Sequence, residues 1–228
     1  MIPGEDACCI LLYGDIGEYS DVTAAAIVRE LMEAEASGKR IDVRINSNGG
    51  DVYTGIAIFN ALRGSKADIH IYVDGIAASM ASVIALCGKP VEMSKYARLM
   101  LHSVSGGCYG NKTELRRCLE EVEALENTLC EMYAPKLGTS VEDIRARYFD
   151  DADHWLKADE ALALGFIDGV YDADSVPEDS TPEQVYRIFN NRLEQPLNDT
   201  QMNLEEVKKR PRFKDCATDS DVFRVMDA

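Results

Sequence analysis

Ser79 lies where a strand-like segment, residues 67–73, gives way to a helix of small residues that is predicted to run towards Cys87. The glycine and alanine residues between positions 75 and 81 leave little side-chain volume around its hydroxyl. Helix N-termini carry free N–H groups and the positive end of the dipole, so they stabilise negative charge. One interpretation of this segment is therefore an attacking serine and its oxyanion; the other is an ordinary N-cap beside a close packing contact.

A pair of glycines follows the strand-like segment 41–46, in the sequence Asn46-Ser47-Asn48-Gly49-Gly50-Asp51. Glycines permit positive φ and let main-chain N–H groups approach a ligand closely. This turn is suited to supply half of an oxyanion hole. Asn-Gly is also one of the commonest pairs in ordinary turns, so the turn alone does not decide between the two.

His102 ends the strand-like segment 98–102, just before the glycine-rich segment 103–110. A histidine at the end of a strand can act as a base and still reach a cleft, or it can be a hydrogen-bonded structural residue. His70 alternates within a strand-like segment, and His154 is expected to pack half-exposed beside its tryptophan neighbour. His102 is therefore the better candidate for a general base.

A group of carboxylates precedes a helix that is predicted to start near Ala158. The members of this group are Asp150, Asp151 and Asp153. One of them is suited to orient a histidine and to stabilise its charged form. The simpler interpretation is an acidic loop that complements the N-terminus of the helix.

Strands and helices alternate along most of the chain, which predicts an α/β core of parallel strands joined by right-handed crossovers. Strands are predicted at residues 9–14, 41–46, 67–73, 91–93 and 99–102, and helices at 21–36, 52–62, from 79 towards 87, and 112–133. Gly38 is the expected stop of the first helix. The long helix 112–133 carries an apolar stripe along one face.

After Asp174 the composition changes to a linker, Ser175-Val176-Pro177-Glu178-Asp179-Ser180-Thr181-Pro182. A short helix is predicted over residues 182–193, and the remainder is polar and irregular. We therefore expect two parts: a folded domain over residues 1–174 and a C-terminal extension over residues 175–228.

The composition excludes several classes of protein. The 228 residues carry 24 basic and 40 acidic side chains, a net charge of −16, which disfavours nucleic acid as the main partner. No apolar run approaches the ~20 residues that span a bilayer, and the acidic first residues lack the positive charge of a secretory signal. The seven cysteines include no C-x-x-C pair, which disfavours a disulfide scaffold or a zinc site and favours a reducing cytoplasm. No P-loop sequence occurs, so the chain itself is not expected to hydrolyse ATP, and we expect neither metal nor cofactor.

Five segments, in this order, resemble the Clp protease proteolytic subunit family. They are residues 45–50 (INSNGG), 75–82 (GIAASMAS), 100–102 (MLH), 153–161 (DHWLKADEA) and 164–168 (LGFID). The resemblance covers residues 9–172, and the Asn48-Gly49-Gly50-Asp51-Val52 turn is closest to the phage-encoded branch. Members of that branch are head-maturation (prohead) proteases, so the resemblance implies a serine endopeptidase with polypeptide substrates.

The resemblance also implies a role for each matching residue. Ser79 would be the nucleophile, His102 its general base and Asp153 the carboxylate that orients the histidine. The main-chain N–H groups of Gly50 and Met80 would form the oxyanion hole. The reaction would be hydrolysis of a peptide bond through an acyl-enzyme.

The family fold is a ββα superhelix of the crotonase type with a long handle helix, which would be residues 112–133 here. Family members assemble into stacked rings, often two heptamers, so the resemblance implies a homo-oligomeric ring. An unfoldase, or phage capsid and scaffold proteins, are the implied partners. The tail after Asp174 has no counterpart in the housekeeping enzymes of the family.

The chain departs from the family pattern near the candidate site. Asn48 replaces the usual proline before the two glycines. Ser82 lies three residues after Ser79 on the same helical face and is a rival nucleophile, although the helix start favours Ser79. Asp150 and Asp151 compete for the third catalytic role.

Two other functions fit parts of the pattern. A crotonase-type acyl-CoA enzyme holds a thioester enolate with two main-chain N–H groups and needs no serine nucleophile, so the glycine turn fits it too. A catalytically silent capsid-assembly or scaffold protein would keep the fold while its serine and histidine lay apart. The serine–histidine pair favours the peptidase.

Overall fold

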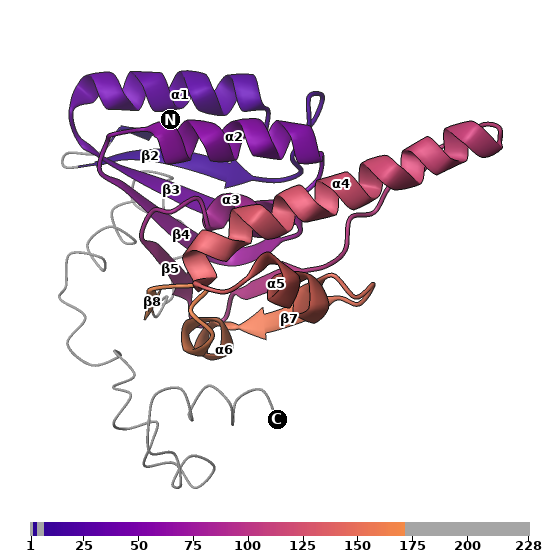
Figure 1. Cartoon of the computed structure of the whole chain (residues 1–228). Coiled ribbons are helices and arrows are strands. Elements are labelled where there is room, and N and C mark those ends of the chain that lie inside the picture. Colours follow the sequence, from indigo (N-terminus) through magenta and orange to yellow (C-terminus); the bar gives the residue numbers. More distant parts are fainter. Residues whose placement is uncertain (1, 4–6, 172–228) are drawn as a thin grey trace, which may run out of the picture.

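The structure is a computed structural model that describes residues 2–3 and 7–171, and the predicted C-terminal extension lies outside this range (Figure 1). The strands are β1 (Ile2–Pro3), β2 (Ala7–Tyr13), β3 (Arg40–Ser47), β4 (Ile69–Ala78), β5 (Val91–Ser94), β6 (Arg98–Leu101), β7 (His154–Lys157) and β8 (Gly169–Tyr171). The helices are α1 (Ala24–Ser37), α2 (Val52–Gly64), α3 (Met80–Ala85), α4 (Lys112–Leu137), α5 (Val141–Tyr148) and α6 (Ala158–Ala163).

The strands form one sheet in the order β1-β2-β3-β4-β5-β8, with β6 and β7 branching from β4. Pairing is parallel from β2 through β5 to β8, and antiparallel between β1 and β2 and between β6 and β7. Strands separated by helices pair in parallel, as the alternating pattern predicts, so the α/β core is confirmed.

The ten-residue strand β4 has two neighbours on the same side, one after the other. Residues 71–73 pair with β5, and residues 76–78 pair in parallel with β6. Because β4 and β6 run in the same direction, their carboxyl ends meet at one edge of the sheet. This fork brings the residue after β4 beside the residue after β6.

Side chains of one face of the sheet form the core. Along β3, Ile41, Val43 and Ile45 have no exposed surface, as expected for alternate positions of a strand packed against helices. Helix α1 buries Ile27 and Leu31, one helical turn apart, against this core. Figure 1 shows α1 and α2 side by side over the sheet, with α4 crossing it obliquely.

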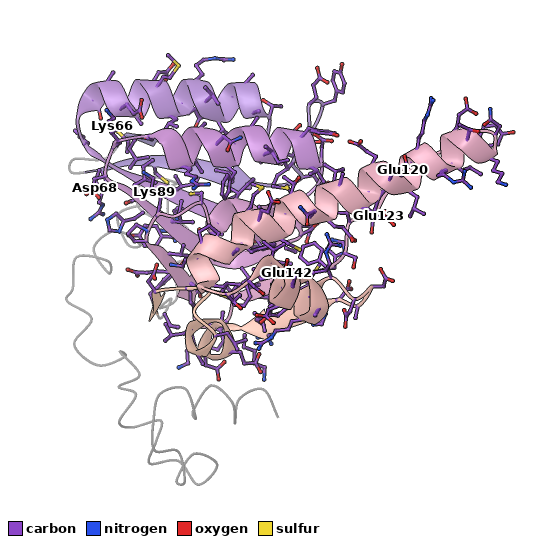
Figure 2. All side chains as sticks on the ribbon, in the orientation of Figure 1. Lys66, Asp68, Lys89, Glu120, Glu123 and Glu142 are labelled. Atoms are coloured by element: carbon purple, nitrogen blue, oxygen red, sulfur yellow. The ribbon has the colours of Figure 1, made fainter. Side chains whose placement is uncertain are left out.

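The long helix α4 begins at a capping box, in which the Asn111 side chain accepts hydrogen bonds from the first turn and the Glu114 side chain accepts one from the Asn111 N–H. Its buried residues Leu129, Cys130 and Tyr133 lie near its C-terminal end. The other end projects from the body of the molecule, and Figure 2 shows Glu120 and Glu123 on this projecting part.

The predicted elements match the structure with short exceptions. The first two helices and the long helix are confirmed as α1, α2 and α4, and Gly38 ends α1 with a positive φ of 68°. Helix α4 runs to Leu137, four residues beyond the prediction: it continues through Pro135 and ends at Gly138, whose φ is 63°. Strand β4 runs on to Ala78, five residues beyond the predicted strand, and β1, β7, β8 and α5 were not predicted from the sequence. None of the helices within residues 7–171 is long and apolar enough to cross a membrane.

Candidate active site

Ser79 occupies a strained turn between β4 and α3. Its backbone has φ 52° and ψ −125°, a conformation that residues other than glycine rarely adopt. Its N–H group donates to the Met100 carbonyl at 2.9 Å, and its carbonyl accepts from the Ser82 N–H at 3.0 Å, so the turn is held from both sides. Although Ser79 stands at the N-cap position, its side chain makes no capping hydrogen bond. The simple N-cap interpretation therefore does not describe this hydroxyl.

The Ser79 hydroxyl instead contacts His102. The distance from Ser79 Oγ to His102 Nε2 is 2.8 Å, within the range for proton transfer to a general base. The fork of β4 produces this contact, because Ala78 pairs with Met100 and the two chains leave the sheet together. The structure thus brings together two residues 23 positions apart that the sequence proposed as nucleophile and base.

Asp153 lies on the other side of the imidazole. Its Oδ1 is 3.9 Å from His102 Nδ1, which is longer than a direct hydrogen bond, and its side chain is 61% exposed. The antiparallel pairing of β6 with β7 sets this position, because His154 lies opposite Leu101. Asp153 is therefore placed to attract the histidine rather than to hold it tightly.

The two rival carboxylates lie elsewhere. Asp150 Oδ1 is 2.7 Å from His154 Nε2, and this hydrogen bond lowers the pKa of Asp150 below its ordinary value. Asp151 has a positive φ of 67°, and its N–H group donates to Ser103 Oγ at 3.0 Å. The expectation that His154 is a packing residue was incomplete, because its ring also meets Tyr148 edge-on at 5.5 Å while it binds Asp150.

The two candidate oxyanion donors come from different segments. Met80 is the first residue of α3, so its N–H group has no acceptor within the helix. In the glycine turn, the Ile16 N–H donates to the Gly49 carbonyl at 2.9 Å, and the Ile16 carbonyl accepts from the Asp51 N–H at 2.8 Å. The N–H of Gly50 takes no part in these two hydrogen bonds. A Cβ built on Gly49 would lie 2.9 Å from the Met80 nitrogen, so the glycine turn packs directly on the serine turn.

A small pocket collects these groups. Its volume is about 150 Å³, and Gly50, Ser79, Met80 and His102 all line it. The remainder of the lining is mostly apolar: Val52, Val83, Ser103, Val104, Ser105, Leu129, Tyr133 and Phe149. A larger cavity of about 600 Å³ lies at the ends of α2, α3 and α4, but none of the candidate catalytic residues lines it. The candidate catalytic residues therefore meet in the smaller pocket.

Ser82 is a structural residue. It has no exposed surface, its Oγ is 2.7 Å from the Tyr133 hydroxyl, and it donates to the Ser79 carbonyl at 2.6 Å. The first contact fastens α3 to α4, and the second fastens α3 to the serine turn. The hydroxyl of the rival nucleophile is therefore occupied by these two hydrogen bonds, and Ser82 does not line the pocket.

A buried polar cluster that the sequence did not reveal supports the end of β4. Arg44 of β3 forms a bidentate ion pair with Asp74, in which the Nε–Oδ2 distance is 2.8 Å. The Tyr13 hydroxyl donates to the same carboxylate at 2.5 Å, and Tyr171 also donates to it. The cluster joins β2, β3, β4 and β8 a few residues before Ser79. The sequence feature that could have indicated this cluster is Arg44, a charged residue at an alternate position of a buried strand.

Among residues 2–3 and 7–171, no group of three or more histidine, cysteine or carboxylate side chains is placed to hold a metal ion.

For the peptide hydrolysis that the family resemblance implies, we expect Asp153→Asn to lower kcat/KM by about 10²-fold, less than the ~10⁴-fold loss typical of a buried triad carboxylate. The smaller loss is expected because the Asp153 carboxylate is exposed and lies 3.9 Å from His102 Nδ1. Asp150→Asn is the matched control and should change kcat/KM less than about twofold, because its partner is His154. Steady-state kinetics on a fluorogenic peptide measures both. A larger loss in the Asp150 variant would reverse the assignment.

Comparison with known proteins shows the family and the fold to which the chain is similar. Residues 7–174 match the family model described as Clp protease. Two curated relatives, each named ATP-dependent Clp protease proteolytic subunit and from two strains of Bacteroides fragilis, are 32% identical over 157 residues. That alignment spans 67% of this chain and 75% and 70% of the relatives. A solved structure of a ClpP1 point mutant from Listeria monocytogenes is similar in fold, with a TM-score of 0.64 at 24% identity, covering 72% of this chain and 91% of that one.

Proposed function

Because the chain belongs to the Clp protease family, we propose that it is a serine endopeptidase with Ser79 as nucleophile, His102 as general base and Asp153 as the third member of the triad. The observation that carries the proposal is the 2.8 Å contact between Ser79 Oγ and His102 Nε2. The contact is made from a strained strand-to-helix turn, and such strain is concentrated at functional sites.

The proposed reaction has two halves. In the first, Ser79 Oγ attacks the scissile carbonyl carbon while His102 Nε2 takes the hydroxyl proton. The carbonyl oxygen becomes an oxyanion that accepts hydrogen bonds from the N–H groups of Gly50 and Met80. When the C–N bond breaks, His102 returns the proton to the leaving amine, and the acyl group stays on Ser79.

In the second half a water molecule replaces the amine. His102 takes a proton from the water as its oxygen attacks the ester carbonyl, and the same two N–H groups receive the second oxyanion. Collapse releases the carboxylic acid, and the proton returns to Ser79 Oγ. Asp153, whose Oδ1 lies 3.9 Å from His102 Nδ1, orients the imidazole ring in both halves.

The serine–histidine contact favours this reaction over the two alternatives. A crotonase-type reaction uses the two N–H groups but has no role for a serine hydroxyl on an imidazole. A silent scaffold protein has no need of a positive φ at Ser79, which costs about 1–3 kcal/mol.

Labelling with a fluorophosphonate probe tests the proposal. We expect wild-type protein and Ser82→Ala to be labelled, and Ser79→Ala to remain unlabelled, because only the hydroxyl of Ser79 meets a base in the pocket. Ser82→Ala leaves the Tyr133 hydroxyl without its buried partner, at a cost of about 1–3 kcal/mol, so its folding is checked by thermal unfolding. Label on Ser79→Ala, or its loss from folded Ser82→Ala, would overturn the choice of nucleophile.

We also propose that the protein forms a homo-oligomeric ring and acts on polypeptides in the cytoplasm. The resemblance of the chain to ring-forming family members supports the ring. The Bacteroides relatives are named as ATP-dependent, so an unfoldase is the proposed partner. The native mass of the labelled sample tests the assembly: a labelled species at the 25.2 kDa mass of one chain would contradict the ring.

The finer proposal is a role in phage head maturation. It rests on the Asn48-Gly49-Gly50-Asp51-Val52 turn, which resembles the phage-encoded branch. We propose residues 1–174 as the peptidase domain and residues 175–228 as a C-terminal extension. Co-expression with a phage scaffold precursor tests this role. An uncut precursor beside active enzyme would exclude it.

A further inference from the structure

The segment that follows His102 runs along α4 in the opposite direction. Three contacts fix its register: Val104 with Glu126, Gly106 with Val122, and Gly110 with Glu114. The Val104 N–H donates to Glu126 Oε1 at 3.1 Å, and a Cβ built on Gly106 would lie 3.3 Å from Val122 Cγ2. A Cβ built on Gly110 would lie 2.8 Å from Glu114 Cβ.

These contacts have a simple geometric rule. Two residues of an extended chain advance about 6.6 Å, and four residues of a helix advance about 6.0 Å. Each step of two residues along the segment therefore matches a step of four residues along α4. The rule places residue 108 opposite residue 118. This position lies between the contact of Gly106 with Val122 and the contact of Gly110 with Glu114. Both positions are cysteines.

The electrostatics agree with this register. The neighbouring Cys118 thiol raises the pKa of Cys108 above its ordinary value. The Cys108 side chain is exposed and that of Cys118 is half-buried, so a small oxidant can reach the pair. The segment also begins at the active site, because Ser103, Val104 and Ser105 line the pocket.

The other described cysteines differ. Cys8, Cys9, Cys87 and Cys130 are buried. Burial raises the pKa of Cys9 to about 12 and those of Cys87 and Cys130 to about 11, so their thiolate forms are scarce near neutral pH. Within residues 7–171, Cys108 and its neighbour Cys118 are thus the cysteines that an oxidant can reach.

We propose that Cys108 and Cys118 form a reversible intrachain disulfide that fastens the segment 103–110 to α4. With a low-molecular-weight disulfide as oxidant, the Cys108 thiolate attacks one sulfur, forms a mixed disulfide and releases one thiolate. The Cys118 thiolate then attacks Cys108 Sγ and releases the second. The two protein thiols lose two electrons and two protons, and the oxidant gains them as two small thiols. The disulfide does not depend on the proposed peptidase activity.

Peptide mapping of the full chain tests this proposal, with oxidised glutathione as the oxidant. The variant Cys216→Ser removes the one cysteine outside the described residues. Trypsin cuts after Lys112, Arg116 and Arg117, so the disulfide joins peptide 99–112 to peptide 118–136 in a species two hydrogens lighter than their sum. We expect this species to dominate after oxidation and to disappear with dithiothreitol.

Two variants identify the bond, because peptide 118–136 also contains Cys130. The joined species should be absent from Cys118→Ser and from Cys108→Ser. We further expect amide hydrogen exchange of residues 104–110 to slow about tenfold in the oxidised protein. Joined peptides that persist in Cys118→Ser would overturn the proposal. So would Cys108 bearing only glutathione, or bonded to a second chain.

Discussion

Ser79→Ala and His102→Ala are each expected to lower kcat/KM for peptide hydrolysis by roughly 10⁴- to 10⁶-fold, and the double variant by no more than either alone. The hydroxyl is a weak nucleophile until the imidazole takes its proton, so losing one partner removes the function of both. The 2.8 Å contact makes the two side chains one unit. Steady-state kinetics on a fluorogenic peptide, with active-site titration of the wild type, measures the three losses.

Thermal unfolding is the control for these variants. Each should change the free energy of unfolding by less than about 1 kcal/mol, because neither residue is buried in the core. Losses that multiply in the double variant would show that the residues act independently, and the proposed pairing would then be wrong. Turnover in Ser79→Ala within about tenfold of the wild type would remove Ser79 from the mechanism.

Local sequence patterns were enough to predict the α/β core and to name Ser79 and His102 as candidates, whereas their roles as nucleophile and base came from the family resemblance. The small residues around Ser79 predicted a strand-to-helix turn with little side-chain volume. In the structure, Ser79 has a positive φ of 52° in this turn. The position of His102 at the end of a strand followed from hydrophobic alternation. The 2.8 Å contact between them could not be predicted from either pattern, because it depends on the fork of β4 between two parallel neighbours.

The remaining ambiguities depended on contacts between distant residues. The choice between Ser79 and Ser82 depends on Tyr133, which lies 51 residues after Ser82 and binds its hydroxyl. The position of Asp153 relative to His102 depends on the register of β6 against β7. Strand β7 has only four residues, and its pattern of exposure is set by this one neighbour, so local propensity carries little information about it.

Gly49→Ala is expected to lower kcat/KM by at least about 10²-fold, because the glycine turn contains one proposed oxyanion donor, the Gly50 N–H, and packs against the other, the Met80 N–H. Gly49 has a positive φ of 96°, which strains any other residue. A Cβ there would lie 2.7 Å from the Ala78 carbonyl oxygen, 2.8 Å from Ser79 Cβ and 2.9 Å from the Met80 nitrogen. None of these atoms is the end of a flexible side chain, so the serine turn itself must move.

Gly64→Ala is the matched control for this substitution. Gly64 ends α2, and a Cβ there would meet no atom within 4 Å, so alanine should stabilise the protein by about 0.5–1 kcal/mol. Gly49→Ala should destabilise it by about 2–4 kcal/mol through strain and overpacking. Urea unfolding separates this effect from catalysis: below the unfolding transition, the loss in folded Gly49→Ala should fall on kcat and on the rate of fluorophosphonate labelling. A folded Gly49→Ala variant with the labelling rate of Gly64→Ala would show that the glycine turn does not form part of the oxyanion hole.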